Sequence, residues 1–161
     1  MIKIQHHKLQ LQHFIKNLVG TFMGIDFKHE VKLRVRYGET DQMGYCYYGR
    51  YAEYFEVGRV ETMRKLGISY KKLEEDGIML PVSELTIKYH KPVFYDNELT
   101  IRTTITKISG ARITFEYTIT HEGQISTTGH TTLVFVDSQS MKPIAVPEKI
   151  IHLLHPYSLE K

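Results

Sequence analysis

Residues 31–67 read VKLRVRYGETDQMGYCYYGRYAEYFEVGRVETMRKLG, and this stretch predicts a strand, a turn and a long helix in succession. Apolar and basic residues alternate from residue 31 to residue 36, which is typical of a half-buried strand. From about Tyr48 to Leu66, apolar and aromatic residues recur at helical spacing, and Gly67 ends the predicted helix. The residues between strand and helix are rich in glycine and tyrosine and contain Asp41.

Outward from this stretch, the C-terminal side predicts a short helix, four strands and a terminal helix. The short helix covers residues 70–75 and ends at Asp76-Gly77, and Pro147 begins the terminal helix through Leu154. Alternating residues predict the strands, which turn signals at Asp96, Gly110 and Gly123 separate. The strands are expected near residues 84–89, 99–105, 113–119 and 125–136. This order predicts an α+β fold in which one antiparallel sheet, a meander after the first strand, is covered by the long helix.

The first 28 residues differ from the rest, and we predict an N-terminal extension (1–28) followed by one domain (29–161). Apolar residues between Leu11 and Phe22 fall at helical spacing, which favours a short amphipathic helix ending near Gly20 or Gly24. The segment lacks the continuous apolar core of a secretory signal and the arginines of a mitochondrial presequence.

The composition favours a cytoplasmic globular protein. The chain has 161 residues, of which 42% are hydrophobic and 24% charged, and no apolar run is long enough to span a bilayer. Its single cysteine excludes an internal disulfide framework. Residues 1–30 carry a surplus of two of the net charge of +3, which leaves +1 for residues 31–161 and argues against a nucleic-acid partner.

The start of the long helix is a candidate reaction site. Residues 46–49 include no Ser, Thr, Asp or Asn that could cap the helix, so its first N–H groups need another partner. Two interpretations of Asp41 remain open from the residues alone. The carboxylate could act as a base or nucleophile beside an oxyanion site formed by those N–H groups, or it could cap the helix from a distance.

The motif resembles that of the hotdog-fold acyl-CoA thioesterases of the 4-hydroxybenzoyl-CoA type, which include the Tol–Pal-associated enzymes. The resemblance extends from about residue 29 to residue 155 and includes Met141-Lys142-Pro143 before the terminal helix. An aromatic residue, an aspartate, a glycine and further aromatics precede a helix with an acidic residue and an arginine. The matching residues are Tyr37, Asp41, Gly44, Tyr47, Tyr48, Tyr51, Tyr54 or Phe55, Glu56 and Arg59.

The resemblance implies that Asp41 is the catalytic carboxylate and that the backbone N–H of Tyr48 polarises the thioester carbonyl. It places Tyr37 close to the carboxylate and Glu56 along the acyl pocket. Gly44 and Tyr51 join the substrate-binding residues. The Tol–Pal branch often has histidine where this chain has Tyr48, and the hydroxybenzoyl branch has tyrosine. This departure favours a main-chain role at position 48 over a side-chain acid or base.

Other residues carry weaker hypotheses. Coenzyme A needs cationic contacts, for which we select Lys91 and Arg112 from the basic residues of the strands and loops. Cys46 is interpreted as a small buried residue because no histidine lies near it in sequence. The histidines show no spacing typical of a metal site, so no metal is predicted.

We therefore predict hydrolysis of an acyl-CoA thioester without a cofactor other than the coenzyme A of the substrate. The resemblance implies homodimers or homotetramers with the site at a subunit interface, and an open sheet edge would favour such pairing. Two alternatives are a hotdog dehydratase or hydratase, for which no histidine occurs near Asp41 in sequence, and a non-enzymatic acyl-CoA sensor, which would need an output module. The acyl group remains open.

Overall fold

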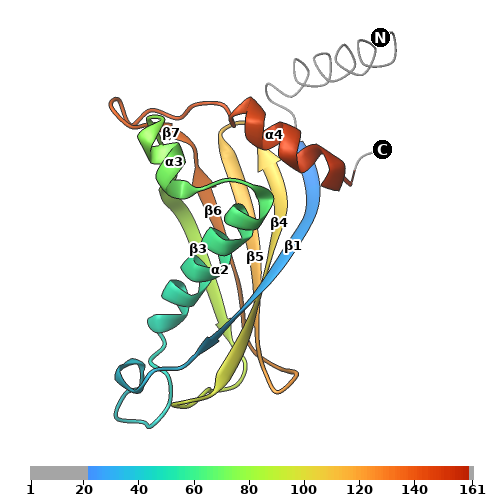
Figure 1. Ribbon diagram of the computed structural model, residues 1–161. Helices are drawn as coiled ribbons and strands as arrows, with labels where there is room; N and C mark the ends of the chain where they lie inside the picture. The colour runs from blue at the N-terminus through green and yellow to red at the C-terminus, as the bar shows by residue number, and fades with distance from the viewer. Residues whose placement is uncertain (1–21, 160–161) are drawn as a thin grey trace.

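The computed structural model describes residues 22–159, which form a five-stranded sheet, with helices on its concave face and at its end, and a separate two-stranded sheet (Figure 1). In chain order the elements are β1 (Phe22–Arg34), η1 (Tyr37–Glu39), α2 (Arg50–Leu66), α3 (Tyr70–Glu75), β2 (Ile78–Met79), β3 (Val82–Tyr89), β4 (Glu98–Ser109), β5 (Arg112–His121), β6 (Gln124–Val134), β7 (Val136–Asp137), α4 (Glu148–Leu154) and η2 (His155–Tyr157).

The five long strands pair antiparallel in the order β1-β4-β5-β6-β3, and β2 pairs separately with β7. The predicted α+β layout is therefore confirmed, but the predicted meander is wrong for β3. Only β4, β5 and β6 follow one another across the sheet, whereas β3 pairs with β6 at the far edge. The place beside β4 is taken by β1, where Val31 opposes Ile101 and Leu33 opposes Leu99.

Helix α2 lies against the concave face of the sheet because two glycines allow a close approach. A Cβ at Gly58 would meet the hydroxyl of Thr103 and the side chain of Ile101. A Cβ at Gly129 would meet the Thr86 carbonyl and the ring of Phe55. Phe55 then stacks on Tyr117, with ring centroids 4.2 Å apart and planes 8° from parallel.

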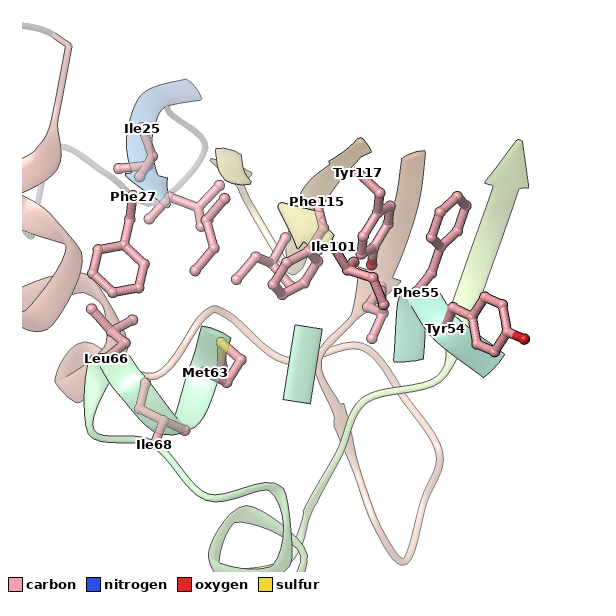
Figure 2. Close-up of a cluster of buried hydrophobic side chains, with 14 of the residues drawn as sticks. Ile25, Phe27, Tyr54, Phe55, Met63, Leu66, Ile68, Ile101, Phe115 and Tyr117 are labelled. Carbon is pink, nitrogen blue, oxygen red and sulfur yellow. The ribbon is translucent and has the colours of Figure 1, made fainter. Parts of the chain in front are cut away.

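The core between helix and sheet is continuous, and Figure 2 shows part of it. Aromatic side chains fill the part near Phe55, and aliphatic side chains with Phe27 fill the part near Leu66 (Figure 2). Full burial of one such side chain contributes roughly 1.5–3 kcal/mol. The core fixes the direction of α2 and thereby the position of its N-terminal end.

The observed end of α2 is the predicted one, and its observed start differs from the predicted start by two residues. Arg50 is the first helical residue, two later than expected, and its N–H donates to the Tyr47 carbonyl at 3.0 Å. At the other end Gly67 takes φ 96°, and its N–H donates back to Arg64, as a left-handed C-terminal residue does.

The boundary predicted at residue 28 falls inside β1. Residues 22–28 are part of the sheet, where Phe22 opposes Ser109 and Met23 opposes Ile108. Met23, Ile25 and Phe27 are buried, so this segment completes the core rather than preceding it. The predicted amphipathic helix otherwise falls on residues 1–21, which lie outside the described residues.

None of the helices between residues 22 and 159 is long and apolar enough to cross a membrane.

Candidate active site

Residues 36–49, which we call the motif loop, lie between β1 and α2 and are anchored at Glu39. This side chain is only 4% exposed. Its carboxylate accepts hydrogen bonds from the Arg36 N–H at 2.8 Å, from the Arg36 guanidinium at 2.6 and 2.8 Å, and from the Tyr54 hydroxyl at 2.7 Å. Because Tyr54 belongs to α2, Glu39 joins the loop to the helix. Sequence analysis missed this residue.

The electrostatics of Glu39 follow from these contacts. Burial alone would raise the pKa of the carboxyl, but the hydrogen bonds from Arg36 and Tyr54 and the charge of Arg36 outweigh it and lower the pKa. The carboxylate in turn raises the pKa of the Arg36 guanidinium. Glu39 is thus held ionised as a structural anchor.

Asp41, two residues further on, is in a different environment. It is half-buried, and its Oδ1 accepts a hydrogen bond from the Met43 N–H at 2.8 Å. Its own N–H donates to the Tyr45 carbonyl at 3.1 Å, and its carbonyl accepts from Gly44 at 2.9 Å. The carboxylate therefore holds its own turn and does not cap α2, which removes the capping interpretation. Gly44 takes φ 84° in this turn, where glycine is favoured.

The start of α2 has no side-chain cap within residues 22–159, as the sequence predicts. The Tyr47 N–H donates to the Glu39 carbonyl at 2.8 Å. By contrast, the N–H groups of Tyr48 and Gly49 donate to no acceptor within the same part of the chain. Two main-chain donors at the positive end of a helix are suited to bind a carbonyl oxygen that becomes negative.

Tyr48 lines a pocket of about 360 Å³ beside the helix start. The pocket brings together the motif loop, α2 and the segment that follows β3, although these are far apart in the sequence. Its lining residues are Tyr45, Cys46, Tyr48, Tyr51, Tyr89, His90, Lys91 and Pro92. Of the predicted site residues, Tyr48, Tyr51 and Lys91 thus meet in one hollow. Asp41 is not part of the lining but is bonded through its backbone to the lining residue Tyr45.

Sequence reasoning missed Tyr89 in this pocket and considered His90 only as one of the basic candidates for coenzyme A contacts. Tyr89 donates its hydroxyl to the Tyr48 carbonyl at 2.9 Å, and His90 lies directly after it. No histidine is near Asp41 in sequence, but the fold brings His90 to the same pocket as Tyr48. Its position after β3 is the only local signal that could have pointed to it.

Besides Asp41, four further predicted site residues lie outside this pocket in the single chain. Tyr37 is exposed and packs edge-on against Tyr95, with ring centroids 5.5 Å apart. Gly44 is in the exposed turn of Asp41. The side chain of Glu56 is 66% exposed and lies 3.8 Å from the Arg59 guanidinium.

Arg112 is the fourth of them. It opposes Ser109, at the opposite end of β4 from Glu98, and lines a separate hollow of about 690 Å³. β4 has twelve residues, so its two ends lie roughly 35–40 Å apart. The loop that precedes α2 is bonded near the Glu98 end, where the Cys46 N–H donates to the Val93 carbonyl. A direct contact with a ligand held at Tyr48 in the same chain is therefore not supported for Arg112.

The Cys46 thiol is buried, as expected, with its sulfur 3.4 Å from the Tyr54 hydroxyl. Burial raises the pKa of this thiol, so it is a poor nucleophile at neutral pH. Burial also raises the pKa of Tyr51 and of Tyr89. Both phenols at the pocket therefore stay protonated and are hydrogen-bond donors at neutral pH.

Within residues 22–159, no three His, Cys, Asp or Glu side chains are grouped so that they could hold a metal ion.

Comparisons with known proteins identify relatives of this chain. A family model described as the thioesterase-like superfamily matches residues 35–154. The putative acyl-CoA thioesterase YneP of Bacillus subtilis is 35% identical over 114 residues, which are 70% of this chain and 83% of that protein. The acyl-CoA thioesterase YbgC of Haemophilus influenzae is 31% identical over 124 residues, or 76% of this chain and 91% of that protein.

Among solved structures, the DHNA-CoA thioesterase from Staphylococcus aureus is 39% identical, with a TM-score of 0.72, and the match covers 73% of this chain and 80% of that one. Together with the antiparallel sheet that wraps α2, this likeness confirms the predicted hotdog fold.

Proposed function

Because the chain belongs to the thioesterase-like superfamily and is an acyl-CoA thioester hydrolase, we propose that its reaction takes place in the pocket beside Tyr48. The observation that carries this proposal is the start of α2, where the N–H groups of Tyr48 and Gly49 have no acceptor within residues 22–159. A thioester carbonyl at this point would receive one or both hydrogen bonds. One well-aimed donor of this kind stabilises the transition state by about 3–4 kcal/mol.

Asp41 supplies the carboxylate in this proposal. It acts either as a general base on a water or as the nucleophile. In the first route, water adds to the carbonyl carbon and the tetrahedral intermediate expels the thiolate of coenzyme A, which takes up a proton. In the second route, Asp41 displaces the same thiolate to form a mixed anhydride, which water then hydrolyses to the free acid. Both routes use the same oxyanion donors.

Coenzyme A enters only as part of the substrate, and the proposed routes use no further cofactor. Lys91 lines the pocket, and its ammonium donates to the Gln124 side chain at 2.5 Å, which holds the positive charge at the pocket rim. We assign Lys91 as a contact for the phosphates of coenzyme A. We propose that Glu56 lines the acyl pocket and that Tyr37 lies close to the carboxylate in an assembly of subunits, and not within a single chain.

A second copy of the chain is the proposed partner. No strand within residues 22–159 pairs with the outer side of β3. The apolar side chains of this edge strand are poorly covered, with Val82 and Leu85 both 44% exposed. Pairing of two such edges would cover these side chains and yield a homodimer or homotetramer. We place the protein in the cytoplasm because its only cysteine is a buried free thiol. Sedimentation of Leu85→Glu against wild type tests this, and an unchanged oligomer would contradict it.

The test of the reaction is thiol release from a panel of aromatic and short aliphatic acyl-CoAs, measured with wild type and Asp41→Asn. Wild type should turn over part of the panel, and this identifies the acyl preference. Asp41→Asn should still bind those substrates and lose most of the turnover. Retained hydrolysis in this variant would remove Asp41 from the mechanism. Hydration of an unsaturated acyl-CoA by wild type would instead favour the hydratase alternative, with His90 as the histidine.

A further inference from the structure

Tyr89 connects the edge strand of the sheet to the start of α2. It is the last residue of β3, and its ring packs edge-on against Tyr51, with centroids 5.2 Å apart and planes at 76°. Its hydroxyl donates to the Tyr48 carbonyl at 2.9 Å. The side chain is therefore fixed at both its ring and its hydroxyl, although the residue is 47% exposed.

This bond acts on the peptide group that carries one of the two oxyanion donors. A peptide group is planar, and its carbonyl and N–H point in opposite directions. A restraint on the Tyr48 carbonyl therefore also orients the Gly49 N–H. The preceding peptide, which contains the Tyr48 N–H, is held by a different bond, from the Arg50 N–H to the Tyr47 carbonyl at 3.0 Å.

The Tyr89 bond is the contact that replaces helical hydrogen bonding at this point. Helix α2 begins only at Arg50, and Gly49 has no side chain to restrain it. Without a donor at the Tyr48 carbonyl, the turn of residues 48–49 would be held only from the Tyr47 side. Two donors must keep a fixed mutual angle if both are to point at one oxygen atom.

We propose that Tyr89 is a positioning residue, whose hydroxyl holds the Tyr48–Gly49 peptide so that the N–H groups of Tyr48 and Gly49 converge on the thioester oxygen. This inference rests on the proposed function of the pocket. The phenol itself transfers no proton, because its hydrogen is already donated to the Tyr48 carbonyl. Burial, followed by the neighbouring Tyr48, raises the pKa of this phenol, so the bond persists across the neutral range.

The variant Tyr89→Phe tests this with the loss of one oxygen atom, because the ring can keep its packing on Tyr51. We expect kcat to fall about tenfold, the size of one hydrogen bond of roughly 1.4 kcal/mol. KM should change less than about twofold, and the pH dependence of kcat should keep its shape. A changed pH profile would indicate proton transfer by the phenol and overturn the positioning role.

A second measurement is independent of activity. In a ¹⁵N-labelled protein, the amide signals of Tyr48 and Gly49 should shift or broaden in Tyr89→Phe. Tyr157→Phe is the matched control, since Tyr157 is exposed, packs edge-on against Phe27 and lies outside the pocket. This control should leave kcat and both amide signals unchanged.

The two proposals fail in distinguishable ways. If Asp41→Asn keeps wild-type hydrolysis, the proposed mechanism fails, whatever Tyr89→Phe does. If Asp41→Asn is inactive and Tyr89→Phe keeps both full kcat and unshifted Tyr48 and Gly49 amides, only the positioning role of Tyr89 is overturned.

Discussion

The two halves of the motif loop differ in almost every physical respect, although they are adjacent in the chain. The first half, residues 36–40, contains the buried carboxylate of Glu39, whose oxygens accept hydrogen bonds from Arg36 and Tyr54. The second half, residues 41–49, contains the half-buried carboxylate of Asp41 with one backbone donor, and two N–H groups without acceptors within residues 22–159. The first half is satisfied and holds the fold, whereas the second keeps unused hydrogen-bonding capacity for a ligand.

The largest difference between the halves should appear in Asp41→Asn. We expect a loss of about 10³-fold in kcat, or about 4 kcal/mol of transition-state stabilisation. The free energy of unfolding should change by less than about 0.5 kcal/mol, because the amide oxygen can still accept from Met43. Urea unfolding monitored by circular dichroism measures the second quantity. A loss of stability above about 1 kcal/mol would place Asp41 with the structural half.

The reverse pattern is expected for Glu39→Ala. This change leaves the buried Tyr54 hydroxyl and the Arg36 N–H without their acceptor, and it should lower the free energy of unfolding by about 2–3 kcal/mol. Activity measured well below the unfolding midpoint should fall less than in Asp41→Asn. If the unfolding free energy is unchanged, the division of the loop into two halves is wrong.

Tyr54→Phe sharpens the comparison with a single atom. The ring stays in the core, and Glu39 keeps its contacts with Arg36 but loses the 2.7 Å bond from Tyr54. We expect a loss of about 1–2 kcal/mol in unfolding free energy, smaller than for Glu39→Ala. In a double-mutant cycle with Glu39→Ala the two losses should not add, because they remove the same contact. Full additivity would show that the two side chains act independently.

The last and smallest expected effect concerns the first half of the loop. It is the pH dependence of the stability that Glu39 contributes. Because folding lowers the pKa of Glu39, its contribution is fully present above the pKa of the unfolded chain, near 4.5, and is lost as pH falls through the folded pKa. Glu39→Gln removes this contribution. The difference in unfolding free energy between wild type and Glu39→Gln should therefore be constant from pH 6 to 7 and shrink below about pH 4.5. A difference that grows toward acid pH would contradict the assignment.

Local rules predict much of the fold. Gly67, Gly110 and Gly123 all take positive φ where turns or a helix end were expected, and Pro147 stands at the start of α4. These features depend on the backbone preferences of single residues, which the sequence displays directly. The uncapped start of α2 is of the same kind.

The parts that sequence missed depend on long-range pairing. The segment of β3 reads as an ordinary strand, and nothing local distinguishes pairing with β6 from pairing with β4. The pocket could not be predicted for the same reason, because Tyr89 and His90 lie close to Tyr48 only when β3 pairs with β6. Glu39 was overlooked because its partner Tyr54 lies fifteen residues away on a helix whose orientation the core decides.

Gly58 and Gly129 have a consequence that reaches beyond packing. Because neither residue has a Cβ, helix and sheet are in direct contact at these two positions, and an added methyl group at either would push α2 outward. The pocket has one wall on α2, at Tyr51, and another at the end of β3, at Tyr89. The width of the opening between these two walls is therefore determined in the protein interior, by two glycines that touch no substrate. A change of acyl preference during evolution could thus arise at these glycines, through the depth of the helix, without any exchange of the residues that line the pocket.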